Sequence, residues 1–293
     1  MKRIILITLS AISLWACDKQ HKKTDAEEWG LKGKVKSVKQ TTYAAVEHLG
    51  KVRKGWNIDY EDLFLKEITA NYYKVFDEKG NQIEGDWYDL YGNVLYKDTY
   101  AYDEKGNQTE EVRYKSDGKI DVKFTFDDRG NQIERVLYKS DGSVRSKKIY
   151  AYDEKGNRIE EVWYDSDGNI EGKVTFMYDE KGNKIEDVSF IYSPFYKSKY
   201  MVFSKWTYAY DNKGNQIEWV IYRSDDNIDG KVTFAYDDKG NSIEVVDYES
   251  DGSMRDKRTL TYEYDAHDNW IKKITYKNGK AESIAEREIT YYE

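Results

Sequence analysis

Residues 152–164 read YDEKGNRIEEVWY, and variants of this phrase recur along most of the 293-residue chain. The shared core is an aromatic residue, Asp, two further residues, Gly and Asn, and usually Ile-Glu after one more position. A degraded last copy has Asp268 in place of the Gly, and the copies begin at Phe76, Tyr102, Phe126, Tyr152, Tyr178, Tyr210, Tyr236 and Tyr264. Self-similarity of this kind is typical of stacked supersecondary units. We therefore predict a repeat architecture.

Each unit is predicted to be a β-hairpin. In Asp-x-x-Gly, the Asp suits the first position of a type I turn and the Gly suits the fourth. A second turn halfway along the unit contains Asp-Gly, a preferred hairpin pair, as in 116–118, 140–142, 166–168 and 250–252. Runs rich in Tyr, Phe, Val, Ile and Thr separate the turns and indicate strands. The predicted fold is all-β: a repetitive antiparallel β-hairpin meander of about sixteen strands in a curled or spiralling sheet.

Alternation along the strands assigns residues to the two faces of the sheet. Strands that end a unit place aromatic residues two apart, as in Tyr150 and Tyr152, and the partner strand places Val162 and Tyr164 on one face and Trp163 on the other. We expect one uniform aromatic face, which the sheet covers by coiling around it or by packing on the N-terminal segment. A β-bulge within a strand would reverse some of these assignments.

Three tryptophans break the pattern and are the candidate ligand-binding residues. By alternation, Trp87, Trp163 and Trp219 lie opposite the Val-Tyr face. Exposed tryptophans on a rigid sheet suit sugar rings or a protein partner, because they offer a large contact area at a low entropy cost. The alternative is that the N-terminal segment or the 190–203 insertion covers them and that they belong to the core.

The N-terminus is predicted to be a targeting segment. Lys2 and Arg3 precede an apolar stretch, Ile4–Trp15, that is short for a membrane-spanning helix. The residues Leu14-Trp15-Ala16-Cys17 resemble the lipobox of bacterial lipoproteins, which implies cleavage before Cys17 and lipidation of its thiol. The alternative is an ordinary secretory signal with an incidental cysteine. Since Cys17 is the single cysteine, lipidation leaves no thiol for a disulfide, a metal or a nucleophile.

The chain is predicted to consist of a signal peptide (1–17), a flexible tether (18–28) and a repeat domain (29–293) with insertions near 47–66 and 190–203. The insertion at 47–66 is interpreted as a long loop or a short helix. The tether resembles the charged leader of surface-exported lipoproteins of Bacteroidetes-type bacteria. We therefore expect a lipid-anchored protein of a Gram-negative cell envelope, at the outer membrane or cell surface, although Asp18 leaves the choice of membrane open.

Charge excludes one class of partner. Without Lys2 and Arg3, the 47 basic residues fall to 45 against 55 acidic ones, a net charge of −10. Charges of both signs are interspersed, as on a solvated sheet. Nucleic-acid binding would need a basic stripe, so no nucleic-acid partner is expected.

The aromatic-Asp-x-x-Gly-Asn phrase resembles the YD repeats of RHS-type proteins, and is similar above all to short YD-repeat lipoproteins of Bacteroidetes. The resemblance covers Phe76 to Glu293, and residues 29–46 resemble the strand that opens such domains. It implies a curled β-meander at the cell surface. The toxin-enclosing shell and self-cleavage of large RHS proteins do not carry over, because the chain is too short and ends in ordinary repeat strand.

Catalytic and metal chemistry find little support in the sequence. His21, His48 and His267 fall in the tether, a loop and the degraded turn, and no Ser-His-Asp or paired-carboxylate arrangement departs from the repeat. Residues 165–169 resemble a fragment of a calcium loop, but Glu171 comes too early for its bidentate acid. We predict a hairpin turn there, no metal site, no catalytic residue, no cofactor and no enzyme activity.

The function predicted from the sequence is a non-catalytic binding or scaffold module at the envelope, held to the membrane by its lipid. Its expected ligand is a polysaccharide or a surface protein, bound by many weak contacts. Two alternatives stay open. One is an envelope-structural protein that assembles through open sheet edges, and the other is an accessory of a toxin system, by the RHS analogy.

Overall fold

The structure is a computed structural model that describes residues 23–57, 71–89, 91–193 and 199–293. Within these ranges a short helix, α1 (Asp25–Glu28), precedes nineteen strands. The first ten are β1 (Val35–His48), β2 (Lys51–Asn57), β3 (Asn71–Phe76), β4 (Gln82–Tyr88), β5 (Val94–Tyr102), β6 (Gln108–Lys115), β7 (Ile120–Phe126), β8 (Gln132–Tyr138), β9 (Val144–Tyr152) and β10 (Arg158–Tyr164). The others are β11 (Ile170–Tyr178), β12 (Lys184–Ser193), β13 (Lys199–Tyr210), β14 (Gln216–Arg223), β15 (Ile228–Tyr236), β16 (Ser242–Tyr248), β17 (Met254–Tyr264), β18 (Trp270–Lys277) and β19 (Lys280–Tyr291).

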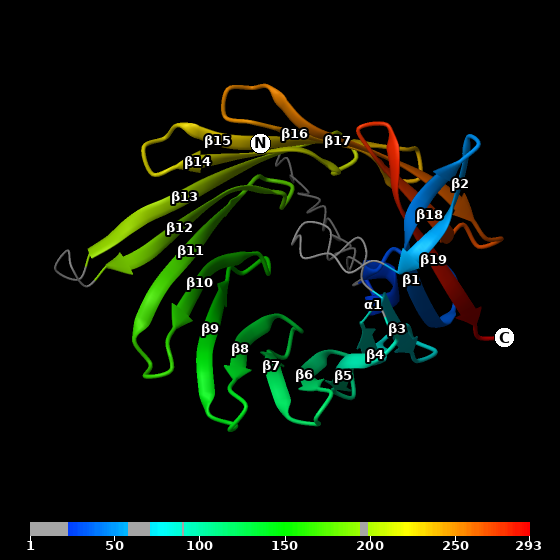
Figure 1. The fold of residues 1–293 in the computed structure, drawn as a ribbon. Helices are drawn as coiled ribbons and strands as arrows, with labels where there is room; N and C mark the ends of the chain where they lie inside the picture. Colours follow the sequence, from blue (N-terminus) through cyan, green and yellow to red (C-terminus); the bar gives the residue numbers. More distant parts are fainter. Residues whose placement is uncertain (1–22, 58–70, 90, 194–198) are drawn as a thin grey trace, which may run out of the picture.

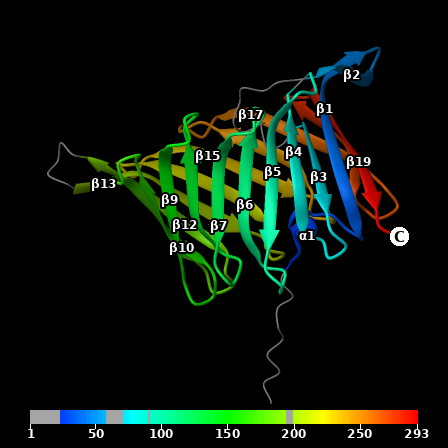
Figure 2. The same ribbon diagram turned by 90° about the horizontal axis from the view of Figure 1, so that it is seen from below.

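All strands belong to one antiparallel sheet that closes on itself (Figures 1 and 2). Strands β3 to β19 follow one another as a meander, and β1 pairs with both β19 and β3. Of the nineteen strands, β2 pairs with β1 alone among the described residues, which leaves a ring of eighteen. The predicted all-β meander is confirmed. The sixteen strands β4–β19 follow Phe76, the first residue of the repeats, and the predicted count was low because β1, β2 and β3 come before them.

The repeated Asp closes each main turn with its side chain. In one copy, the Asp153 N–H donates to the Asn157 carbonyl at 2.9 Å, and the Gly156 N–H donates back to the Asp153 carbonyl at 3.1 Å. The Asp153 carboxylate accepts from the backbone N–H groups of Lys155 and Asn157 and from the Asn157 amide. The amide hydrogen bond lowers the pKa of Asp153. Gly156 has φ +87°, which confirms the predicted role of glycine at the fourth position.

Most intermediate turns have the same backbone without an Asp at the first position, which is Lys115, Lys139, Arg223 or Glu249, whereas Asp89 and Asp165 keep it. The Lys139 N–H donates to the Ser143 carbonyl at 2.8 Å, and Gly142 takes φ +83°. Asp141 accepts from the Ser143 N–H instead. The Asp-Gly pair thus ends a three-residue loop, a type I turn followed by a left-handed residue, rather than forming a two-residue turn.

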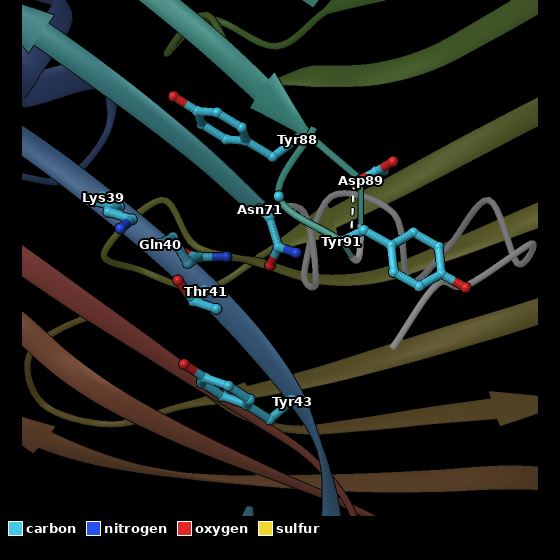
Figure 3. Close-up of a pocket in the computed structure, with 9 residues that line it drawn as sticks. Lys39, Gln40, Thr41, Tyr43, Asn71, Tyr88, Asp89 and Tyr91 are labelled. Carbon is cyan, nitrogen blue, oxygen red and sulfur yellow. Dashed lines mark hydrogen bonds between the residues drawn. The ribbon is translucent and has the colours of Figure 1, made fainter. Parts of the chain in front are cut away.

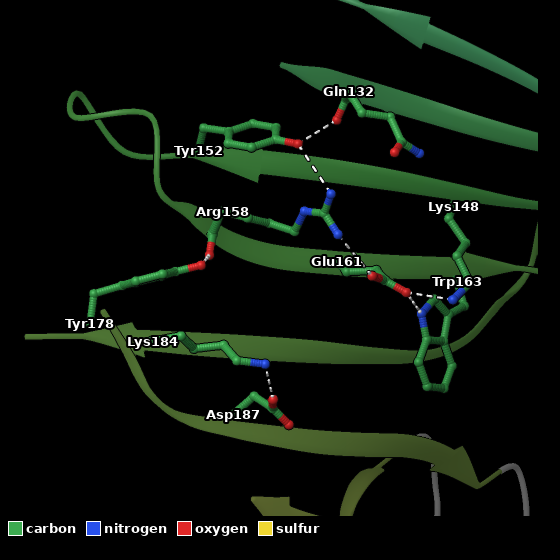
Figure 4. Close-up of polar contacts among 9 residues, drawn as sticks. All are labelled: Gln132, Lys148, Tyr152, Arg158, Glu161, Trp163, Tyr178, Lys184 and Asp187. Atoms are coloured by element: carbon green, nitrogen blue, oxygen red, sulfur yellow. Dashed lines mark hydrogen bonds and ion pairs between the residues drawn. The ribbon is translucent and has the colours of Figure 1, made fainter. Parts of the chain in front are cut away.

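A β-bulge follows each main turn, and in most units a tyrosine of the next unit donates to its carbonyl; Phe126 has no hydroxyl to do so. In β10 the register with β9 shifts between Arg158 and Glu160. The Tyr178 hydroxyl then donates to the Arg158 carbonyl at 2.8 Å, and the Tyr152 hydroxyl donates to the Gln132 carbonyl at 2.7 Å (Figure 4). The same contact joins the pairs Tyr102–Gln82, Tyr210–Lys184, Tyr236–Gln216 and Tyr262–Ser242.

The bulge changes the predicted face assignment. Directly paired residues share a face, and Tyr150 pairs with Glu161 while Lys147 pairs with Tyr164. Tyr150 and Trp163 therefore lie on one face, and Val162 and Tyr164 lie on the other. The predicted single aromatic face is wrong, because the two sets of aromatic residues occupy opposite sides of the sheet.

The face that carries Tyr150 and Trp163 is the inner wall of the ring. Figure 1 shows α1 on the inner side of the sheet, where Ala26 and Leu31 form a buried cluster with Tyr72 and Phe76 of β3. Tyr72 pairs with Trp87, and the strand register carries this face around the ring. The expectation that the sheet coils around aromatic side chains is confirmed for the aromatic pairs at strand ends.

The outer face is charged and regular. Glutamates and lysines of neighbouring strands pair across it, for example Glu110 with Lys123 and Glu160 with Lys173 at 3.3 Å. Related pairs are Glu84–Lys97, Glu134–Lys147, Glu218–Lys231 and Glu244–Lys257. These mid-strand charges place the outer face in water. In the part of the chain that the structure describes, no helix is long and apolar enough to cross a membrane.

The N-terminal segment is structured from Thr24, unlike the tether predicted over 18–28. Thr24 and Glu27 form a capping box, in which each side chain accepts from the other residue's backbone N–H. The Ala26 N–H donates to the Gly80 carbonyl at 3.0 Å, and the Asp25 carboxylate accepts from the Gln82 N–H at 2.7 Å. These contacts fix α1 to the first repeat turn. Residues 18–22, with His21, and the predicted signal with Cys17 lie outside the described residues.

The degraded eighth turn holds the two ends of the domain together. The Asn269 side chain accepts from the Lys32 N–H at 2.7 Å and donates to the Lys32 carbonyl at 2.8 Å. It also donates to the Tyr291 hydroxyl at 2.8 Å, and His267 stacks on the Tyr291 ring at 4.0 Å. Asp268 takes φ +62°, the conformation that glycine has in the other copies. The departure from the repeat thus coincides with ring closure.

The two predicted insertions extend strands. The first, 47–66, contains the tip of the β1–β2 hairpin, whose turn residues Leu49 and Gly50 have positive φ angles, rather than a long loop or helix up to Asn57. The second, 190–203, lengthens β12 and β13 to 10 and 12 residues, more than most strands of the repeats. Residues 58–66 and 194–198 of these insertions lie outside the described residues.

The tyrosine contact predicts a measurable loss of stability. Tyr152→Phe leaves the Gln132 carbonyl of the bulge without its donor, so the free energy of unfolding should fall by about 1–2 kcal/mol. Urea unfolding of the purified chain measures this change. Tyr164→Phe is the matched control, because it removes a hydroxyl from the outer face of the adjacent strand. Equal losses in both variants would show that the bulge contact adds no stability.

Candidate functional site on the inner wall

The three candidate tryptophans lie on the same wall but not in one cluster. Trp87 belongs to β4, Trp163 to β10 and Trp219 to β14, and each side chain is half-buried. The strand register places all three on the inner face, together with the aromatic pairs. Their surroundings differ, although Trp87, like Trp219, also packs against a buried cluster, the one that α1 forms with β1 and β3.

Trp219 packs into an apolar cluster. Its ring lies 4.9 Å from that of Trp206, and it contacts the buried group formed by Val232, Val245 and Leu260. These neighbours come from β13 and from β15 to β17. The contacts match the alternative interpretation, in which the tryptophan belongs to the core.

Trp163 lies in a polar network on β9 and β10, shown in Figure 4. Its indole N–H donates to the Glu161 carboxylate at 2.5 Å, and the Lys148 Nζ lies 4.9 Å from the centre of its ring. Lys148 also forms an ion pair with Glu161, and Arg158 lies 3.8 Å from the same carboxylate. One acidic group thus serves three donors.

Trp87 lines a cavity of about 230 Å³ between α1 and strands β3 to β6. The indole of Trp29, just after α1, forms part of the opposite lining. The full lining is Asp25, Glu28, Trp29, Lys74, Gln82, Trp87, Asp98, Tyr100, Gln108, Glu111 and Arg113. The cavity therefore combines two tryptophans with carboxylate, amide, hydroxyl and guanidinium groups.

Asp98 accepts hydrogen bonds from two other residues that line this cavity, Trp87 and Arg113. The side chain is almost fully buried, with 1% exposure, and it accepts from the Arg113 Nε at 2.7 Å and from the Arg113 Nη2 at 2.8 Å. The Trp87 indole N–H donates to its second oxygen at 2.7 Å. A buried charge needs such pairing, because leaving water is costly. These bonds hold the Trp87 and Arg113 side chains in place before any ligand binds.

Lys74 lies among aromatic rings at the edge of the same cavity. Its Nζ is 4.0 Å from the centre of the Trp29 ring and 5.1 Å from that of Trp87, and it donates to the Gln82 Oε1 at 3.3 Å. Burial lowers the pKa of Lys74 to about 8. Burial also raises the pKa of the nearby Glu111 to about 7, and the charge of Asp98 adds to that rise. Both groups change their protonation close to neutral pH.

A second cavity, of about 400 Å³, lies at the rim where β1 leaves β3 and turns towards β2 (Figure 3). Gln40, Tyr43, Asn71, Tyr88 and Tyr91 are among its lining residues. Several of its polar atoms already serve the local fold, since Asn71 accepts from the Thr42 N–H and Asp89 closes the turn after β4. Burial raises the pKa of Tyr88 to about 12. We assign this cavity to the architecture of the rim.

The residues weighed for metal or catalytic chemistry have structural contacts. The Asp165 carboxylate accepts from the Asp167 and Asn169 N–H groups and from the Asn169 amide, as in the other turns. His267 stacks on Tyr291, and His48 ends β1. The described residues contain no group of three or more His, Cys, Asp or Glu side chains that could hold a metal ion.

Comparisons with known proteins found similarity to solved structures only. No family model and no curated protein matches the sequence. A porin-like protein from Bacteroides uniformis aligns with 87% of this chain and 96% of its own, at 10% identity and a TM-score of 0.43. A porin-like protein from Bacteroides vulgatus aligns with 88% of this chain and 98% of its own, at 14% identity and a TM-score of 0.36. A putative outer membrane lipoprotein-sorting protein domain from Vibrio parahaemolyticus aligns with 88% of this chain and 85% of its own, at 8% identity and a TM-score of 0.27. Similarity this low carries no information about function.

Sequence reasoning identified one residue of the Trp87 cavity and missed the others. Trp29, Lys74 and Arg113 come from separate segments, and the pairing of β3 to β6 with α1 packed against them brings the three together. One signal was readable: Lys74 interrupts an apolar alternation in β3, where Tyr72 and Phe76 are buried on the same face. A lysine at such a position indicates a specific polar environment.

The raised pKa of Glu111 predicts a pH-dependent stability. Its pKa is about 7 in the folded state against 4.5 ordinarily, so its contribution to stability is full below 4.5 and is lost as the pH rises through 7. Glu111→Gln removes this loss. The free energy of unfolding of the variant, relative to the original chain, should therefore increase by about 1–2 kcal/mol between these pH values. Thermal unfolding across that range measures it.

Glu110→Gln is the control for this measurement, because Glu110 lies on the outer face in an ion pair with Lys123. Parallel pH profiles for Glu111→Gln and the original chain would contradict the burial of a carboxyl group in the cavity.

Proposed function

We propose that this chain is a non-catalytic, lipid-anchored protein of the bacterial envelope that binds a saccharide inside its ring of strands. The observation that carries the proposal is the cavity between Trp29 and Trp87, with its fixed polar groups. The predicted signal and Cys17, together with the YD-repeat resemblance, support the envelope location. The polysaccharide ligand expected from the sequence is retained, and its site moves to the inner wall.

The chemistry of the cavity favours an uncharged, hydroxylated ligand. Tryptophan rings offer flat apolar surfaces to the C–H faces of a sugar, and amide, hydroxyl and carboxylate groups at fixed positions suit its hydroxyls. The strongest charges, Asp98 and Arg113, already neutralise each other. The volume of about 230 Å³ is below the roughly 300 Å³ at which pockets for drug-sized ligands begin, so we expect the cavity to hold one sugar ring of a chain.

The structure weakens the runner-up function. Self-assembly was expected to use open sheet edges, but β1 closes the ring by pairing with β19 and β3. Among the described strands, unpaired edges are left at β2 and at the extended tip of the β12–β13 hairpin. The role as an accessory of a toxin system still depends on the repeat resemblance alone.

A fluorescence titration tests the binding site. We expect a saturable change in tryptophan emission when the chain, purified in non-ionic detergent, is titrated with a panel of neutral oligosaccharides. Trp87→Leu removes both the ring surface and the indole N–H, and should weaken binding about tenfold or more. Trp219→Phe, on the same wall but in the apolar cluster, should bind normally. Unchanged affinity in Trp87→Leu, or no binding across the panel, would sink the proposal.

Membrane attachment has its own test. Lipidation at Cys17 predicts that the chain incorporates a fatty-acid label and enters the detergent phase in Triton X-114 partitioning. Cys17→Ser should abolish the label and move the chain to the aqueous phase. Label retained in Cys17→Ser would contradict the lipid anchor.

A further inference from the structure

A second part of the inner wall, on β8 to β10, carries more positive than negative charge. Arg135, Lys148 and Arg158 project from this wall, and Glu161 is the carboxylate that Lys148 and Arg158 share. The chain as a whole has a net charge of −8, so composition does not explain this local excess. These strands lie outside the Trp87 cavity, which α1 and β3 to β6 form.

Two of these cations face each other directly. Arg135 pairs with Lys148 across β8 and β9, and like charges in directly opposed positions destabilise a sheet. The inner wall also has a directly opposed pair of acidic residues, but each of these has its own basic partner. Asp247 and Asp256 also oppose each other, but Arg255 lies 3.3 Å from Asp247 and Lys277 lies 3.0 Å from Asp256. Each acid has its own partner there, whereas one carboxylate serves the basic group.

At its position of the repeat, Arg135 differs in charge from both neighbouring units. The matching residues of the units on either side are acidic, Glu111 and Glu161. The Arg135 Nε is buried, and no described protein atom accepts a hydrogen bond from it. Its guanidinium lies 5.8 Å from the centre of the Phe124 ring. A buried donor without an acceptor costs free energy, which a ligand oxygen at this point would recover.

Aromatic rings lie among these cations. The Arg158 guanidinium stacks 4.3 Å from the centre of the Tyr150 ring, and Trp163 lies beside Lys148 (Figure 4 draws Lys148, Arg158 and Trp163). Burial raises the pKa of Tyr150, and the positive charges of Arg158 and Arg135 both oppose that rise. Cations interleaved with aromatic rings suit anionic groups on a ring-containing ligand.

We propose that Arg135, Lys148 and Arg158 form a second binding site, for the carboxylate or sulfate groups of an acidic polysaccharide. The proposal rests on the proposed saccharide-binding function and adds the charge of the ligand. Guanidinium groups bind carboxylates and sulfates through paired hydrogen bonds, and the rings of Tyr150 and Trp163 contact the sugar. The repulsion between Arg135 and Lys148 is then relieved when the anion binds.

Calorimetric titration with oligogalacturonate, a chain of carboxylated sugars, tests this site on the full chain in non-ionic detergent. Arg135→Gln should weaken binding about tenfold or more, and should lower the dependence of the affinity on salt concentration. Arg145→Gln is the matched control, since it removes the same charge from an exposed position of β9 that pairs with no residue of β8. Its affinity should equal that of the original chain.

Thermal unfolding separates binding from structure. Because Arg135→Gln relieves a like-charge contact, it should melt at or above the temperature of Arg145→Gln. A lower melting temperature would assign Arg135 a structural role and overturn the proposal. Equal affinities for oligogalacturonate in Arg135→Gln and Arg145→Gln would also overturn it.

Two further outcomes distinguish a polysaccharide from a small anion, and this second site from the proposed site at Trp87. If monomeric galacturonate or inorganic sulfate binds as tightly as the oligomer, the site is a simple anion site and the polysaccharide proposal fails. Loss of oligogalacturonate binding in Arg135→Gln, combined with no binding of neutral sugars at Trp87, would support the second site and reject the first.

Discussion

A hydrogen bond from a tyrosine hydroxyl to a bulge carbonyl connects most units to the next, and the unit that begins with Phe126 has no hydroxyl to make it. The tight turn after each aromatic-Asp pair is followed by a bulge, which removes one carbonyl from the ladder of the sheet. A buried carbonyl without a donor costs about 1–3 kcal/mol. The Tyr178 hydroxyl supplies the donor for Arg158, and the Tyr152 hydroxyl supplies it for Gln132. In these units the tyrosine of the repeat is therefore fixed against the preceding unit.

Turns and strands were predictable from the sequence because their causes are local. The Asp, Gly and Asn of one copy contact each other, as in Asp153 to Asn157, and need no distant residue. The faces were not predictable by alternation, because a single extra residue at the bulge after Arg158 reverses the count and places Trp163 with Tyr150. The capping box at Thr24 was readable as a helix start, but the charged composition around it favoured a tether.

The candidate site was predictable only in part, for a related reason. The three tryptophans stand out from the repeat, and the structure places them on one wall, but their roles depend on neighbours from other units. Trp87 faces a cavity because α1 and Lys74 reach it, and Trp219 is packed because Trp206 and Val232 meet it. Such neighbours follow from the pairing of successive strands, as between Trp219 and Val232, and from the contact of α1 with the first repeat turn at Gly80 and Gln82.

The two faces of the ring differ in how closely their side chains follow the repeat. The outer face repeats the same Glu-Lys pair from unit to unit, as between Glu160 and Lys173. The inner position that Arg135 occupies holds Glu111 and Glu161 in the neighbouring units, Trp219 and Val245 further on, and Lys273 near closure. The hydrogen bonds of the turn Asp and of the tyrosine hydroxyl do not involve this position. Its side chain can therefore differ from unit to unit. A framework of this kind places a different group at each step along the wall, and that is the arrangement a chain-like ligand with varied groups requires.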